Sequence, residues 1–197
     1  MNMKDLVIMS HGLGALKKEM YFERELFLDF GYDLLLYDQR NSGENFAPLN
    51  TFGYYEAYDL KDIFLYADKV NNRKKILWGQ SMGAMAIAIS IGKFDIKPEF
   101  LIFDSPVFNG KEMIYKEFDN IEKETGIHKY LMVMSGNLIS KIRYGFDFSD
   151  LTANKYLRDT DIPLLMLSAK NDEITSLESQ RDFFNRLNNI NKKNDNL

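Results

Sequence analysis

Gly-Gln-Ser-Met-Gly, at residues 79–83, is the stretch of this chain that says most about its fold. The form G-x-S-x-G is typical of a strand that turns sharply into a helix and holds a serine hydroxyl exposed on a strained backbone. Gly79 and Gly83 let the strand and the helix approach closely and leave open space around the hydroxyl. An apolar strand pattern ends at Trp78, and a helical run of small and apolar residues follows. The pattern therefore favours a nucleophile at Ser81 over a plain tight turn.

The composition indicates a folded, mildly acidic protein. Of the 197 residues, 45% are hydrophobic and 14% aromatic, enough for a sizeable core in one domain. The formal net charge of −4 argues against a basic nucleic-acid-binding surface. The chain has no cysteine, which excludes disulfides and thiolate zinc sites. We expect one domain over residues 1–197, with no metal, no cofactor and no nucleic-acid partner.

The start of the chain runs directly into a short apolar strand pattern at residues 6–9. This stretch is too short for the core of a signal peptide and lacks a cleavage site of small residues. No other segment approaches the length needed to span a membrane. We therefore expect a cytoplasmic protein with no membrane partner.

Short apolar strands alternate with amphipathic helices, the pattern of a parallel sheet covered on both faces. We expect strands at residues 6–10, 33–37, 75–78, 100–104 and 164–168. We expect helices at about 17–30, 55–70, 84–91 and 176–187, followed by a frayed polar tail at 188–197. The fold class is α/β, with a mostly parallel, doubly wound sheet.

The rhythm changes over residues 106–162, a stretch too long for a simple crossover between strands. Helical patterns at about 111–124 and 127–144 are rich in Met, Tyr and charge, and we interpret the stretch as a helical cap inserted above the sheet. Five side chains of this stretch could line an acyl pocket, and ordinary packing between the helices explains them equally well. They are Met113, Tyr115, Tyr130, Met132 and Met134.

Five short motifs, in this order, carry a family resemblance. Residues 11–14 are similar to an H-G oxyanion loop, and residues 38–44 to a D-x-R-G-x-G-x-S loop. Residues 79–83 match a nucleophile elbow, 104–106 resemble a segment that leads into a cap, and 168–174 look like a G-x-x-D loop. On these motifs the chain resembles the α/β-hydrolase superfamily, and within it the bacterial serine-aminopeptidase-like and esterase-like hydrolases with a helical cap.

The resemblance implies an α/β-hydrolase fold whose strands, numbered along the chain, lie in the order second, first, third, fourth, fifth. Strand order then reverses between the first and third strands, and α/β folds place ligands at such a switch point. This brings Leu13 beside Ser81, as acyl transfer requires. The amides of Leu13 and Met82 can then stabilise a carbonyl oxygen as it becomes an oxyanion.

The resemblance also implies roles for the charged and imidazole side chains. Asp172 is the candidate triad acid, with Glu173 a weaker candidate and a solvated turn aspartate the plain alternative. His11, beside Gly12, supports the oxyanion loop rather than acting as the base. We expect two further residues, Asp38 and Arg40, to pin their own loop by an ion pair and backbone hydrogen bonds, and His128 to be a solvated helical histidine.

A serine nucleophile needs a general base, which in this superfamily is a histidine that follows the acid. No residue after Asp172 is a histidine. The resemblance would place a further strand and the histidine loop after residue 197 and two strands before residue 6, so we expect a chain truncated at both ends. Three explanations stay open: a fragment of an ordinary hydrolase, a degenerate inactive relative, or a base supplied unusually by His11 or His128.

Truncation would make residues 33–37 and 164–168 the two edges of the sheet, although both strands are mostly apolar. Exposed apolar edges favour pairing with other chains, so self-association through the sheet edges is a further expectation.

The expected function is that of a serine hydrolase that cleaves an ester, thioester or amide of a small or medium acyl substrate. The alternative is a catalytically impaired or inactive remnant that binds a small molecule or a protein partner. A haloperoxidase or dehalogenase of the same fold is a weaker hypothesis, because dehalogenases of this fold place an aspartate at the elbow.

Overall fold

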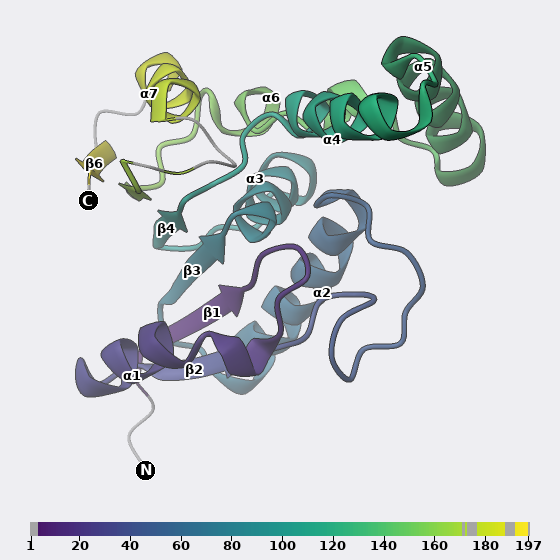
Figure 1. Ribbon diagram of the computed structural model, residues 1–197. Coiled ribbons are helices and arrows are strands. Elements are labelled where there is room, and N and C mark those ends of the chain that lie inside the picture. Colours follow the sequence, from purple (N-terminus) through teal and green to yellow (C-terminus); the bar gives the residue numbers. More distant parts are fainter. Residues whose placement is uncertain (1–3, 171, 173–176, 188–191, 197) are drawn as a thin grey trace.

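The computed structural model describes residues 4–170, 172, 177–187 and 192–196, and its centre is a parallel sheet of six strands (Figure 1). The strands lie in the order β2-β1-β3-β4-β5-β6. Their bounds are β1 Leu6–Ser10, β2 Asp33–Leu36, β3 Lys75–Gln80, β4 Phe100–Asp104, β5 Leu164–Ser168 and β6 Lys192–Asn196. The predicted order of the first five strands is confirmed, and strand order reverses between β1 and β3 as expected.

The strand β6 corrects two expectations. It pairs in parallel with β5, with Leu164 opposite Lys192 and Ser168 opposite Asn196. The strand at 164–168 is therefore not an edge of the sheet, and residues 192–196 are not a frayed tail. The prediction failed because β6 is held in the sheet by hydrogen bonds of its backbone. Its polar sequence therefore shows no alternation of apolar residues by which a strand could be recognised. The other predicted edge is correct, since β2 ends the sheet, and self-association through it stays a prediction.

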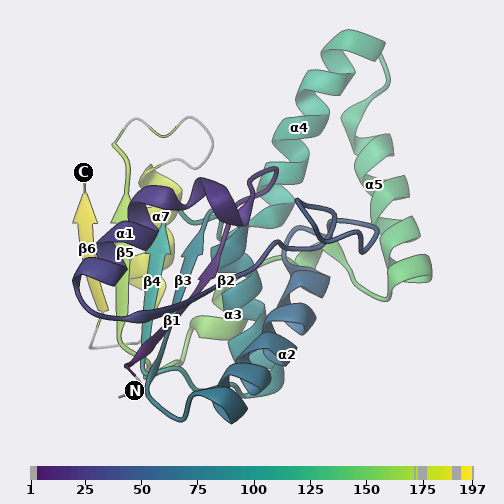
Figure 2. The ribbon, with the colours of Figure 1, turned by 90° about the horizontal axis from the view of Figure 1, so that it is seen from below.

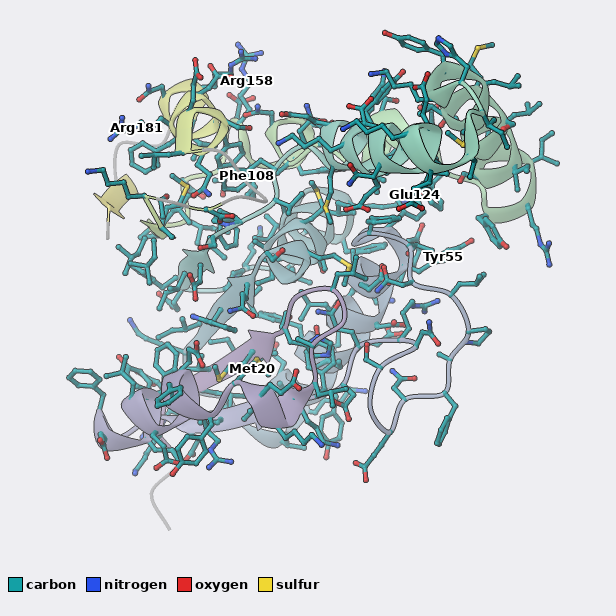
Figure 3. All side chains as sticks on the ribbon, in the orientation of Figure 1. Met20, Tyr55, Phe108, Glu124, Arg158 and Arg181 are labelled. Carbon is teal, nitrogen blue, oxygen red and sulfur yellow. The ribbon has the colours of Figure 1, made fainter. Side chains whose placement is uncertain are left out.

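Helices cover both faces of the sheet, which confirms the doubly wound prediction (Figures 1 and 2). The described helices are α1 Tyr21–Asp29, α2 Tyr54–Val70, α3 Met82–Phe94, α4 Gly110–Thr125, α5 Lys129–Ile139, α6 Asn154–Leu157 and α7 Leu177–Arg186. Because successive strand residues point to opposite faces, each face has its own core. Val7 and Trp78 pack with Met20 and Phe27 on the α1 side, and Figure 3 labels Met20 there.

The opposite face carries the larger core. Ile8, Leu77 and Leu101 point to this side and pack against apolar residues of α2 and α3. Helix α7 joins the same core through Phe183, whose ring stacks on that of Phe108 with 3.5 Å between centroids (Figure 3 labels Phe108).

Helix α3 ends at Phe94, three residues past the predicted end at about residue 91, and passes through Gly92. A methyl group at position 92 would lie 2.6 Å from the Cβ atom of Tyr156, so the glycine permits the close approach of α6 instead of ending the helix.

The segment between β4 and β5, predicted as a cap, consists of short helices. Helices α4 and α5 form a hairpin that extends beyond the sheet (Figure 2). The predicted helix at 127–144 is α5 followed by a π-helical turn, Ser140–Tyr144. The hydroxyl of Tyr55, on α2, donates to the carbonyl of Tyr144 at 2.6 Å and holds the end of the hairpin on the body of the protein (Figure 3 labels Tyr55).

In the part of the chain that the structure describes, no helix has both the length and the apolar character needed to cross a bilayer.

Candidate active site

Ser81 connects β3 to α3 in a backbone conformation that few residues other than glycine adopt. Its φ is 50° and its ψ is −114°. The surrounding backbone holds it there: the Ser81 N–H donates to the Asp104 carbonyl at 3.0 Å, and the Ser81 carbonyl accepts from Val107 N–H at 3.2 Å. A strained conformation fixed by its neighbours is typical of functional sites. The sharp strand-to-helix turn predicted from the G-x-S-x-G pattern is present.

The glycines of the elbow are required by close backbone approach. A methyl group at position 83 would lie 2.1 Å from the carbonyl oxygen of Ser10, at the end of β1. One at position 79 would lie 2.8 Å from the backbone nitrogen of Ala84, in the first turn of α3. Neither space accepts a side chain, so α3 begins directly against the carboxyl ends of β1 and β3 (Figure 1).

The loop after β1 lies against Ser81. A methyl group at Gly12 would come within 3.3 Å of the Ser81 Cβ atom, a contact possible only if the two residues are adjacent in space. The following residue, Leu13, has an N–H that donates to no backbone acceptor among the described residues. The predicted proximity of the Leu13 loop to Ser81 is therefore present, as the reversal of strand order at β1 and β3 requires.

A cavity of about 270 Å³ opens beside Ser81. It brings together the candidate nucleophile, the candidate oxyanion loop and the candidate acid, because its lining residues are Gly12, Leu13, Ala15, Gln80, Ser81, Ser105 and Asp172. None of the five Met and Tyr side chains considered for an acyl pocket is among them. Two of these five are largely exposed, Tyr130 at 55% and Met134 at 72%. The alternative acid, Glu173, lies outside the described residues.

His11 is buried and both of its ring nitrogens are engaged. The Gln39 N–H donates to Nε2 at 2.9 Å, so the ring proton is on Nδ1, which lies 2.8 Å from the Gly12 carbonyl oxygen and donates to it. The Gln39 side-chain amide also donates to the His11 carbonyl. With its acceptor nitrogen occupied, His11 has no lone pair for the Ser81 proton, and its bonds instead hold the loop that carries Leu13.

His128 lies at the start of α5 and is not among the residues that line the cavity. It precedes the first turn of α5, where its Nδ1 accepts from the Tyr130 N–H at 3.4 Å and its ring stacks on the ring of Tyr130. Its side chain is 66% exposed, as expected for a solvated histidine. These are the two histidines of the chain, and neither imidazole has a hydrogen bond to the Ser81 hydroxyl in the part of the chain that the structure describes.

Two residues at the end of β4 belong to the site and were not predicted as functional. Ser105 lines the cavity with a φ of 43°, and Asp104 accepts the Ser81 N–H through its carbonyl. Burial raises the pKa of the Asp104 carboxyl, and the negative charges of Glu23 and Asp172 raise it further. The site thus includes a half-buried carboxyl group at Asp104 and a second hydroxyl group at Ser105. Their position after β4, beside β3 in a parallel sheet, was the available sequence signal.

The charged residues of the loop after β2 do fix it, but the expected ion pair between Asp38 and Arg40 is wrong, because each of these side chains pairs with a residue outside the loop. Asp38 accepts from the backbone N–H groups of Lys17 at 2.9 Å and Glu44 at 3.1 Å, and pairs with the Lys17 ammonium at 3.1 Å. Burial opposes the charged form of Asp38, but these hydrogen bonds outweigh it and lower its pKa. Arg40 instead binds both oxygens of Asp59, on α2, at 2.8 Å each. Neither side chain lines the cavity.

No group of three or more His, Cys, Asp or Glu side chains suited to a metal ion occurs among the described residues. The polar side chains among the residues that line the cavity are those of Gln80, Ser81, Ser105 and Asp172.

Comparison with known proteins agrees with the fold. The family model described as alpha/beta hydrolase fold matches residues 5–101. A curated relative, the uncharacterized protein YqkD of Bacillus subtilis (strain 168), is 25% identical over 186 residues. The match covers 91% of this chain and 59% of YqkD, so the chain spans about three fifths of that relative's length.

Solved structures share the fold at low sequence identity. The Pyrococcus furiosus esterase Pf2001 superposes with a TM-score of 0.76 at 19% identity, over 98% of this chain and 73% of its own. The esterase EaEST from Exiguobacterium antarcticum gives 0.70 at 16% identity, over 100% and 84%. A monoacylglycerol lipase of Paleococcus ferrophilus gives 0.68 at 17% identity, over 98% and 83%.

Proposed function

Because this chain belongs to the α/β-hydrolase superfamily, we propose that it is a serine hydrolase that cleaves an ester, thioester or amide of a small or medium acyl substrate. The observation that carries the proposal is Ser81. Its backbone is held at φ 50° and ψ −114° at the edge of a cavity that it shares with the Leu13 loop and Asp172. A residue with a side chain is strained in this conformation, and a tight turn without a function would avoid the strain by having glycine at this position.

In the proposed reaction, the Ser81 Oγ attacks the carbonyl carbon of the substrate as its proton passes to a base. The carbonyl oxygen becomes an oxyanion, which the amides of Leu13 and Met82 stabilise; loss of one such donor typically costs about 2.7–4 kcal/mol of barrier stabilisation. The leaving group departs with a proton, and water then releases the acyl group from Ser81. Asp172 is proposed to orient the base, as the acid of a triad does.

The proposed reaction needs a general base for the Ser81 proton, and neither histidine of the chain is placed to supply it. His11 is committed to Gln39 and Gly12, and His128 lies in the cap. When the histidine of a serine triad is removed, as in subtilisin, turnover falls by a factor on the order of 10⁶. We therefore expect this chain by itself to hydrolyse p-nitrophenyl acetate very slowly. Robust turnover that disappears in Ser81→Ala would contradict that expectation.

A second candidate function rests on the same observation about the histidines. A cavity with no imidazole can still hold a small molecule, so the alternative is a non-catalytic binding module that retains the fold.

A serine-directed fluorophosphonate probe, with peptide mapping by mass spectrometry, distinguishes the two functions. The hydrolase proposal predicts a single adduct on Ser81 that forms slowly, because no imidazole is hydrogen-bonded to the Ser81 hydroxyl, and that is absent in Ser81→Ala. Ser105→Ala is the matched control, because Ser105 lines the same cavity and its loss should leave the Ser81 adduct in place. A folded protein with no adduct would favour the binding module.

A further inference from the structure

Helix α5 carries a stripe of apolar side chains that faces solvent. Leu131, Met134 and Leu138 are spaced by three and four residues, so they share one face of the helix, and Ile142 continues it into the π-helical turn. Their exposed fractions are 65%, 72%, 58% and 77%. The stripe extends about 16 Å along the axis at 1.5 Å per residue. Apolar side chains that gather in this way mark an interaction surface, unlike scattered single ones.

The rotation of α5 is fixed by its opposite side, so the stripe cannot turn inward without breaking contacts. Val133 is 4% exposed and belongs to the main core. The Asn137 side-chain oxygen accepts from the Phe148 N–H at 2.7 Å, and the Lys129 ammonium pairs with Asp119 of α4 at 2.5 Å. The hairpin that carries the stripe extends beyond the sheet (Figure 2).

The charge around the stripe selects its partner. Residues 125–146 contain no Asp or Glu, whereas the chain as a whole has a formal charge of −4 and the neighbouring helix α4 carries five carboxylates, of which Asp119 pairs with Lys129. Lys141 and Arg143 are exposed beside Ile142, and neither has a carboxylate at ion-pair distance among the described residues. Pairing the stripe with a second copy of itself would bring these acid-free, cationic segments together, which opposes a symmetric dimer.

We propose that the α5 stripe adsorbs to anionic lipid bilayers, with its apolar side chains among the acyl chains and Lys141 and Arg143 at the headgroups. A helix with an apolar face and cations beside it lies in the plane of the interface. The expectation of no membrane partner rested on the lack of a spanning segment, which is a different mode of contact. The proposal does not depend on the proposed hydrolase function.

Helix α1 provides a matched comparison within the same protein. It also exposes apolar side chains, with Phe22 at 82% and Leu26 at 54%. Its sequence Tyr21–Asp29 contains three acidic residues and one arginine, so an anionic bilayer repels it. If exposed apolar area alone caused adsorption, both helices would bind.

The test is flotation of the protein with vesicles of phosphatidylcholine alone and with vesicles in which about a third of the lipid is phosphatidylglycerol. We expect binding to the anionic vesicles, weakened by salt. The double variant Met134→Glu with Leu138→Glu should lower the partition coefficient by at least about tenfold, since two apolar side chains no longer insert. Lys141→Glu with Arg143→Glu should lower it by about fivefold or more for each charge.

The control is Phe22→Glu with Leu26→Glu, which removes similar apolar side chains from α1 and should leave the partition coefficient unchanged. Circular dichroism checks that each variant is folded. The proposal is overturned if the unmodified protein does not float with anionic vesicles, or if the control loses as much binding as the α5 variant. It is also overturned if the α5 substitutions only dissociate a dimer in sedimentation velocity, which would assign the stripe to a second copy.

Discussion

Replacement of Ser81 by glycine should stabilise the fold relative to replacement by alanine. At φ 50° and ψ −114°, a residue with a Cβ atom is strained, and the strain remains in Ser81→Ala because alanine keeps the Cβ atom. Glycine adopts positive φ at no steric cost, so Ser81→Gly relieves it. Both variants lack the hydroxyl, and the comparison therefore isolates the backbone.

The magnitude follows from two opposing contributions. Conformations of this kind cost about 1–3 kcal/mol for a non-glycine residue. Glycine returns about 0.4–1 kcal/mol to the unfolded chain through its greater conformational freedom. We expect Ser81→Gly to be more stable than Ser81→Ala by about 1 kcal/mol, which for a chain of this size is a rise of about 2–4 °C in Tm.

Urea unfolding followed by circular dichroism measures the difference, provided that the two variants share the same denaturant slope. Ser135, in the middle of α5, is the control: in a regular helix glycine is about 1 kcal/mol less favourable than alanine, so the order there should be reversed. If glycine is the less stable substitution at both positions, the backbone at Ser81 is not strained and the argument for a preorganised nucleophile fails.

Three other predictions concern the packing and the charges around the site. Gly83→Ala should destabilise the fold by about 2–3 kcal/mol, because the added methyl group would meet the Ser10 carbonyl. Gly136→Ala should stabilise it by about 0.5–1 kcal/mol, since its methyl group would lie 3.6 Å from the Phe148 ring. Urea midpoints measure both changes. The pKa of Asp38 is lowered in the folded protein, so its carboxylate stabilises the fold fully above the ordinary pKa of 3.8. This stabilisation is lost as the pH falls through the pKa that Asp38 has in the folded protein. Asp38→Asn should therefore lower the free energy of unfolding by about 2 kcal/mol at neutral pH and by little in strong acid. The pKa of Asp104 is raised in the folded protein, so the free energy of unfolding should fall as the pH rises from 3.8 through the pKa that Asp104 has in the folded protein. Asp104→Asn should remove this fall. If the variant shows the same pH dependence of stability, burial does not disfavour the Asp104 carboxylate.

Local sequence patterns were sufficient for much of the architecture. The strand β1, at Leu6–Ser10, and the strand β4, at Phe100–Asp104, have their predicted bounds because short apolar runs between turn signals have few other stable forms. The elbow was predictable for a similar reason, since Gly79 and Gly83 indicated a close approach before any contact was known. The polar strand β6 was missed, because it is specified by pairing with β5 rather than by its own side chains.

The site shows the same division. The order of the five motifs predicted that the Gly12 loop, Ser81 and Asp172 would meet, because the carboxyl ends of parallel strands share one edge of the sheet. The part played by Asp104 and Ser105 was missed because no local pattern marks these two residues, although the predicted position of β4 beside β3 already placed them next to Ser81.

By itself the sequence determined the α/β class, the strand-turn-helix at Ser81 and the order of the motifs, since these depend on residue type and spacing along the chain. Only the tertiary structure decided that both His11 nitrogens are occupied, that Arg40 binds α2, and that the apolar stripe of α5 faces solvent. Each of these features depends on distances between residues that are far apart in the chain, and the local periodicity of the sequence does not predict such distances.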